Sequence, residues 1–142
     1  MSIRYFNDGI KFQVQNKRKI SEWLKKIITQ EGKKTGDLSF IFVSNEIILD
    51  INKKFLNHDY YTDIITFDYS TQDSISGEMY ISIETVKENA ILYGAEFTNE
   101  LLRVMLHGIL HLCGYKDATI AEQQTMRATE NNYLNNIPQL ET

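Results

Sequence analysis

Residues 101–117 read LLRVMLHGILHLCGYKD, and this stretch decides how the rest of the chain is interpreted. Its apolar residues predict a helix in which His107 and His111 stand four residues apart. Residues i and i+4 of a helix lie on one face, with Cβ atoms about 5–6 Å apart, so two imidazoles can bind one metal ion. Gly114 follows where a left-handed helix cap favours glycine. Asp117 can then reach the same ion, which gives three ligands and an open fourth position, as in catalytic zinc sites.

A pair of histidines at this spacing also occurs without a metal, as hydrogen-bonded polar residues. Three features favour the metal: the chain has only three histidines, the helix around the pair is apolar, and Gly108 leaves room beside His107. Gly108 also stands where the H-E-x-x-H motif of zinc peptidases has its glutamate base. The sequence therefore disfavours a zinc peptidase.

Length and composition predict one globular domain that spans residues 1–142, with 42% hydrophobic and 24% charged residues. The single cysteine cannot form an internal disulfide, which fits a reducing cytoplasm. No stretch near residue 1 has the apolar core of a signal peptide, and no run approaches the ~18 apolar residues of a membrane span. We therefore expect a cytoplasmic protein that does not bind membranes.

The net charge of −4 is unevenly distributed along the chain. Residues 1–60 contain 11 Lys and Arg against 7 Asp and Glu, whereas residues 61–142 contain 4 against 12. A basic face in the first part can bind phosphates even though the total charge is negative. Lysines that merely keep a helix soluble explain the same pattern. The basic residues concerned are Lys17, Arg18, Lys19, Lys25, Lys26, Lys33 and Lys34.

Hydrophobic periodicity predicts an α+β fold: one domain with about four strands in one mixed sheet and helices packed on it. The metal site is expected on a central helix and in the loop after it. The strands are expected at residues 3–6, 38–43, 64–67 and 79–83, with residues 71–77 forming a turn. The helices are expected to begin at the caps Asn16, Ser44 and Thr98, after residue 83, and at the capping box formed by Thr119 and Glu122.

These motifs resemble those of the YbeY-like endoribonucleases, the rRNA maturation factor family. The segment His107-Gly-Ile-Leu-His111-Leu-Cys-Gly114-Tyr115 is similar to the family core H-G-x-L-H-L-x-G-Y. Three further segments resemble N-x-x-[YF], T-D-[VI]-[LI]-[ST]-F and G-[DE]-I-x-I-S, and two residues of the last helix stand at the family's spacing after the metal loop. These are residues 52–55, 62–67 and 77–82, with Met126 and Glu130.

The resemblance implies a zinc-dependent, single-strand-specific endoribonuclease that acts in rRNA maturation and ribosome quality control. It implies one Zn²⁺ per chain, and as partners single-stranded RNA or rRNA and the ribosomal small subunit or its proteins. His107 and His111 are then the first two ligands, and Asp117 replaces the family's third histidine. An aspartate ligand also admits Mn²⁺ or another divalent ion. Lys116 replaces a family aspartate, and Leu56 replaces an arginine thought to act on the phosphate.

No residue is assigned to catalysis beyond the metal ligands. The attacking group is either a metal-bound water or the RNA 2′-hydroxyl. His58 could be a general base or a loop histidine, and Tyr115 could stack on a base or pack in the turn. Glu130 is expected to hydrogen-bond near the metal without binding it. The candidates for catalysis are His58, Lys116 and Arg103, and those for RNA binding are Lys17, Arg18, Lys25, Lys26, Lys53, Lys54 and Tyr115.

Two other functions remain open at this point. Leu56 and Asp117 are compatible with a ribosome-associated binding module that keeps the metal for structure and cleaves weakly or not at all. The ligands His107, His111 and Asp117 also match a 2-His-1-carboxylate iron oxygenase. Such oxygenases usually take their ligands from strands, whereas two of these ligands share a helix, so this reading is disfavoured.

Overall fold

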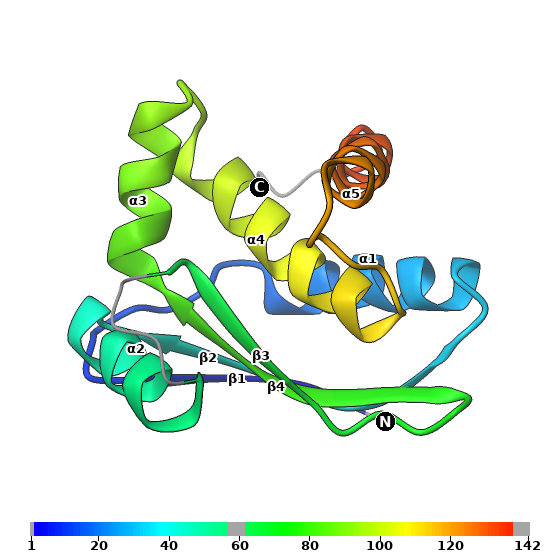
Figure 1. Ribbon diagram of the computed structural model, residues 1–142, viewed down its shortest axis with the longest axis horizontal. Helices are drawn as coiled ribbons and strands as arrows, with labels where there is room; N and C mark the ends of the chain where they lie inside the picture. Colours follow the sequence, from blue (N-terminus) through cyan, green and yellow to red (C-terminus); the bar gives the residue numbers. More distant parts are fainter. Residues whose placement is uncertain (1, 57–61, 138–142) are drawn as a thin grey trace.

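The computed structural model describes residues 2–56 and 62–137, and four strands of this part form one mixed sheet in the order β1-β2-β4-β3 (Figure 1). β1 (Ile3–Asp8) and β2 (Lys34–Val43) pair in parallel, and so do β2 and β4 (Ser74–Ser82). β3 (Ile64–Asp68) pairs with β4 antiparallel, at the edge of the sheet. The predicted mixed sheet in a single α+β domain is therefore confirmed.

Five helices connect or follow the strands of this sheet. α1 (Lys17–Gln30) joins the parallel strands β1 and β2, as a crossover connection requires. α2 (Asn45–Ile51) runs into a π-helical turn, Asn52–Leu56. After the sheet come α3 (Ile83–Leu92), α4 (Phe97–Leu112) and α5 (Ile120–Leu134).

The two faces of the sheet carry cores of very different size. Side chains of β2 alternate between them: Phe40 and Phe42 enter the main core with α1 and α4, whereas Val43 packs with Ile48 of α2 on the opposite face. Figure 1 shows the same division, with α2 below the sheet and α1, α4 and α5 above it. The helix that carries the two histidines therefore lies on the main core.

Gly108 lets the backbone of α4 pack directly against side chains of β3 and β4. A Cβ atom at this position would come within 2.8 Å of Met79 Sδ and 2.9 Å of Ile64 Cδ1. Both distances are shorter than van der Waals contact, so only glycine fits without movement of its neighbours. The residues on either side of Gly108 are thereby placed at a fixed height above β3 and β4.

Two helix caps differ from the prediction, and two agree with it. Asn16 stands at the N-cap of α1 but adopts a left-handed conformation, with φ of 59°, and its side chain forms no cap hydrogen bond. α4 begins one residue before Thr98, so Thr98 lies inside the first turn and is not a cap. The side chains of Ser44 and Thr119 cap α2 and α5 as predicted, and Thr119 with Glu122 forms the capping box.

β4 is longer than its sequence suggests. The predicted turn at residues 71–77 is wrong from Ser74 onwards, because Ser74 and Ile75 pair with Lys34 and Thr35 of β2. Serine and glycine have low β-propensity, but the ladder with β2 supplies their backbone partners. β1 extends two residues beyond the predicted strand at residues 3–6.

Two further observations concern the extent of the chain. His58, one of the candidates for catalysis, lies outside the described residues. Within residues 2–56 and 62–137, no helix is both long and apolar enough to cross a membrane.

Candidate metal centre

Two histidines of α4 and one aspartate of the following loop come together at one point. Asp117 Oδ2 lies 3.2 Å from His107 Nε2 and 3.4 Å from His111 Nε2. The imidazole rings are 4.8 Å apart between centroids and inclined by 77°. One ligand atom of each residue lies within 4.8 Å of the others, which is the geometry of a group that could hold a metal ion. The i,i+4 spacing therefore places the two imidazoles side by side, as predicted, and Asp117 lies beside both of them.

The chain reverses after α4 through Gly114, which has a φ of 110°. The Gly114 N–H donates to the His111 carbonyl, and the Tyr115 N–H donates to the Leu110 carbonyl, each at 3.0 Å. This left-handed ending satisfies carbonyls at the end of the helix. It also returns the chain towards the histidines within six residues.

The start of α5 holds the backbone beside Asp117. The Gln123 side chain donates to the Asp117 carbonyl at 3.1 Å, and the Glu122 carboxylate accepts from the N–H groups of Ala118 and Thr119. Because these bonds occupy the backbone, the Asp117 side chain is left to face the two imidazoles. The capping box thus fixes the loop as well as the helix.

Glu130 of α5 reaches the other nitrogen of His107. Its Oε2 lies 2.6 Å from Nδ1 of His107, and its Oε1 accepts from Arg103 Nη1 at 2.9 Å. A carboxylate can only accept in such a contact, so Nδ1 donates to Glu130 and Nε2 is the ring nitrogen that faces Asp117 and His111. Burial alone would lower the pKa of His107, but the hydrogen bond and charge of Glu130, with Asp117 and Asp63, raise it overall.

A carboxylate that is distant in the sequence holds the turn after α4 and ties it to α5. Glu31, at the end of α1, accepts a hydrogen bond from Tyr115 at 2.8 Å and another from Tyr133 of α5. Tyr115 therefore packs in the turn with its hydroxyl engaged, rather than presenting a free ring beside the histidines. No local sequence pattern marks Glu31, since its two partners lie 84 and 102 residues away.

Two cavities meet at the cluster. The first, of about 300 Å³, lies against β3 and is lined by residues 62–66 with the three candidate ligands. The second, of about 320 Å³, shares His107 and Asp117 and extends between α3, α4 and α5. The side chains of His107, His111 and Asp117 are 24%, 32% and 43% exposed, so the cluster is open to an entering molecule.

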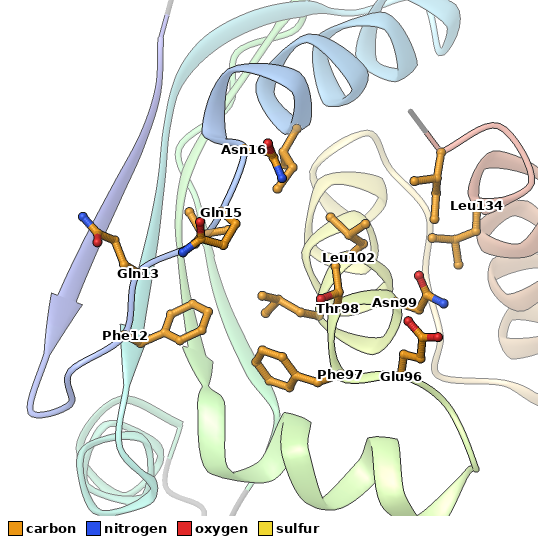
Figure 2. Close-up of a pocket in the computed structure, with 14 residues that line it drawn as sticks. Phe12, Gln13, Gln15, Asn16, Glu96, Phe97, Thr98, Asn99, Leu102 and Leu134 are labelled. Atoms are coloured by element: carbon orange, nitrogen blue, oxygen red, sulfur yellow. The ribbon is translucent and has the colours of Figure 1, made fainter. Parts of the chain in front are cut away.

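A larger cavity, of about 640 Å³, lies elsewhere (Figure 2). It is formed by the segment before α1, the start of α4 and the end of α5, and Figure 2 shows Phe12 and Phe97 there, whose rings meet edge to face. Glu96 is the one ionisable residue among the described residues that line it. A single carboxylate, with no group of candidate metal ligands beside it, offers no chemistry comparable with that of the histidine cluster.

The remaining candidates are placed less favourably. Arg103 is bound to Glu130 and Asn131, and Tyr115 to Glu31. Lys54 pairs with Asp50 at 3.0 Å, and Arg18 with Glu22 at 3.2 Å. Among the described residues, no lysine lines either cavity at the cluster. The candidates with exposed side chains are Lys17, Arg18, Lys25, Lys26, Lys53, Lys54 and Lys116.

The structure also brings forward two acids that the sequence interpretation did not assign. Asp63 lines both cavities, and its pKa is raised by burial and lowered by the neighbouring His107. Glu100 lines the second cavity from the first turns of α4. Its spacing could have revealed it, because Glu100 stands seven residues before His107 and thus on the same face of the helix.

Comparisons with known proteins identify the family. The model of the family described as Endoribonuclease YbeY matches residues 4–138. The curated relative "Endoribonuclease YbeY" of Bacteroides thetaiotaomicron is 45% identical over 134 residues, which cover 94% of this chain and 98% of the relative. That of Parabacteroides distasonis is 45% identical over 139 residues, or 98% of each chain.

A solved structure agrees with the sequence comparisons. The solution structure of TM1509 from Thermotoga maritima superposes with a TM-score of 0.67 at 30% identity, covering 96% of this chain and 89% of that one. Nearly the whole chain is thus matched by sequence and by fold. The chain belongs to the endoribonuclease YbeY family.

Proposed function

We propose that this chain is a zinc-dependent, single-strand-specific endoribonuclease that acts in rRNA maturation and ribosome quality control in the cytoplasm. The observation that carries the proposal is the cluster of His107, His111 and Asp117 in a chain whose relatives are named endoribonucleases. The family model spans residues 4–138, which supports one functional unit over residues 1–142.

The donor set fits a divalent ion. Two imidazole nitrogens and one carboxylate oxygen are ligands that Zn²⁺ accepts in catalytic sites, with one ion per chain. The carboxylate also suits Mn²⁺ or another oxygen-preferring ion better than a third histidine would. When bound, such an ion lowers the pKa of a bound water and polarises a phosphoryl oxygen.

The residues around the cluster orient the ligands. Glu130 holds the proton of His107 at Nδ1, which leaves Nε2 as the donor towards the metal. Arg103 holds Glu130 and so acts as a positioning residue rather than as a free phosphate ligand. Lys116, exposed beside Asp117, is the remaining catalytic candidate of this loop, whereas His58 lies outside the described residues. Either a bound water or the RNA 2′-hydroxyl could be the nucleophile.

The proposed substrate is single-stranded RNA, naturally rRNA, on or near the ribosomal small subunit. Its backbone carries negative charge, which exposed cations would meet before the cleavage site is reached. The proposed contact residues are Lys17, Arg18, Lys25, Lys26, Lys53 and Lys54, whereas Tyr115 is held in its turn by Glu31.

Two departures from the family pattern favour a second candidate function. Leu56 replaces the family arginine and Asp117 the third histidine, so the chain could be a ribosome-associated binding module that keeps the metal for structure. The two candidates predict opposite results with purified RNA.

The deciding experiment incubates purified protein with single-stranded and structured RNA, with and without chelator, alongside His111→Ala. The enzyme should cleave the single-stranded RNA and leave casein intact, and both chelator and the substitution should abolish cleavage. Chelator-resistant cleavage that survives His111→Ala would sink the proposal. Metal-loaded protein that co-sediments with ribosomal particles but cuts nothing would establish the binding module instead.

A further inference from the structure

The cavity between α3, α4 and α5 has the position of a subsite. It shares His107 and Asp117 with the proposed metal centre, so a group bound in it would lie directly beside the ion. Its volume of about 320 Å³ stands at the lower end of the ~300–1,000 Å³ typical of small-ligand sites. Figure 1 shows α3 and α5 on either side of α4. The cavity therefore has room for one small group and not for a duplex.

Glu100 supplies the first sign that this cavity receives a ligand. The residue is only 6% exposed, yet among the described residues its carboxylate makes no hydrogen bond and no ion pair. In the same part of the chain, no fully buried side-chain oxygen lacks a partner, so the Glu100 oxygens must reach the cavity surface. The Glu100 carboxylate therefore faces the cavity without a protein donor among the described residues, so its oxygens are available to a ligand that donates hydrogen bonds.

Glu130 is the matched case that makes Glu100 unusual. It is 4% exposed on the same cavity, but both of its oxygens are engaged, by Arg103 and His107. Burial raises the pKa of Glu100, and the positive charges of Arg103 and Arg127 counteract part of that effect. Glu100 thus has cationic neighbours without a direct bond to either of them in the described structure.

The remaining lining residues have the chemistry of base recognition. The amides of Asn89 and Gln123 and the guanidinium of Arg127 offer donors and acceptors. Tyr93, the residue after α3, is 62% exposed, and its side chain forms no ring contact or hydrogen bond with other described residues. Unpaired bases are recognised by this combination of an aromatic face and groups that reach the base edge.

We propose that this cavity binds the base of the unpaired nucleotide next to the cleaved phosphate, with Glu100 accepting hydrogen bonds from that base. The inference rests on the proposed endoribonuclease function and adds a specificity to it. Guanine presents an N1–H and an N2 amino group side by side, which match the two carboxylate oxygens. Adenine and cytosine present one amino group each, whereas uracil presents its N–H between two carbonyl oxygens that repel a carboxylate. The expected order is guanine first and uracil last.

Nucleoside 5′-monophosphates test the subsite without any cleavage, because they contain no phosphodiester bond. Zinc-loaded protein is titrated with GMP and UMP and followed by NMR. GMP should bind about fivefold to tenfold more tightly than UMP, given the discrimination typical of a bidentate base contact. Glu100→Gln should remove the preference, while Glu96→Gln, on the same helix but outside this cavity, should keep it.

A second variant protects the test if Glu100→Gln does not fold. Tyr93 is exposed, so Tyr93→Ala should fold normally and weaken GMP and UMP binding by a similar factor. Equal affinity of wild type for GMP and UMP, no binding of either, or an unchanged preference in Glu100→Gln would each overturn the inference. Base preference without RNA cleavage would refute only the enzyme, and cleavage without base preference would refute only the subsite.

Discussion

Glu130 and His107 are joined at 2.6 Å on the side of the imidazole that faces away from Asp117. The partner of one ring nitrogen is therefore supplied by α5, and the partner of the other by the loop between α4 and α5. This division sets the orientation of the ring before any ion is present.

Removing this carboxylate should weaken metal binding although Glu130 is not a ligand. We expect Glu130→Ala to lower zinc affinity by about 10-fold to 100-fold, as loss of such a supporting hydrogen bond typically does. Loss of the ion pair between Arg103 and Glu130 should also reduce the free energy of unfolding, by about 1–3 kcal/mol. Competition with a chromogenic chelator and denaturant titration measure the two effects. Glu88→Ala, exposed on α3, is the control, and equal zinc affinity in both variants would refute the role of Glu130.

Asp117 should determine both metal retention and metal preference. Asp117→Ala should lose its zinc during exhaustive dialysis, whereas Lys116→Ala should keep it, as elemental analysis would show. Asp117→His replaces an anionic ligand by a neutral one, so the ion becomes a stronger Lewis acid. Activity should then rise at a lower pH and prefer zinc over manganese more sharply. If Asp117→Ala retains zinc as firmly as wild type, Asp117 is not a ligand.

Gly108→Ala should destabilise the protein even though alanine is the better helix former. The gain in helix propensity is at most about 1 kcal/mol. The new Cβ would lie 2.8 Å from Met79 Sδ, in a fully buried contact, and such overpacking typically costs about 1–3 kcal/mol. Thermal unfolding should show a lower Tm than wild type. Thr98→Ala, exposed on the first turn of α4 and not its cap, should change stability by less than about 0.5 kcal/mol.

Cys113 should be an unreactive thiol at neutral pH. Burial, aided by the negative charge of Glu31, raises its pKa to about 11, so the thiolate is scarce at pH 8. The folded protein should react slowly with a thiol-alkylating reagent, and the urea-unfolded protein at the normal rate. In the unfolded chain the thiol has its ordinary pKa of 9.0 and ionises at a lower pH than in the folded protein. The contribution of Cys113 to the free energy of unfolding should therefore fall as the pH rises above 9.0. Equal alkylation rates in the folded and unfolded protein would contradict the shift.

The basic residues of α1 should contribute to RNA binding through charge alone. Replacing Lys17, Arg18, Lys25 and Lys26 by glutamine should weaken binding of single-stranded RNA and flatten its dependence on salt. Fluorescence anisotropy at several salt concentrations measures both. The fold should be unaffected, because all four side chains are exposed. An unchanged salt slope would mean that these residues serve solubility.

The sequence predicted those parts of the fold and site that depend on local spacing. A spacing of four residues in a helix places His107 beside His111. A spacing of three residues likewise lets Thr119 and Glu122 form the capping box, and neither arrangement depends on contacts with distant segments. The capping predictions failed where competing backbone geometry decided: Asn16 adopts a left-handed conformation, and α4 starts before Thr98.

Contacts between distant segments were out of reach of the sequence. Glu130 was expected to find a partner near the metal, but only the packing of α5 on α4 shows that it serves both Arg103 and His107. The sequence predicts a turn where β4 begins, because the strand pairing there depends on β2 rather than on the residues of β4 themselves. The sequence also does not show that the buried carboxylate of Glu100 has no partner among the described protein residues, because this follows only from the packing around the cavity.

The bonds of Glu31 to Tyr115 and Tyr133 also set the order in which the site can be completed. Tyr133 emerges 102 residues after Glu31 during synthesis, and Glu130 follows His107 by 23 residues. A nascent chain that lacks α5 has both histidines but neither the acid that orients His107 nor the tyrosine that ties α5 to α1. If the protein cuts RNA as we propose, its cutting site is completed only after α5 has been synthesised. A nascent chain that ends before α5 should therefore not yet cleave RNA.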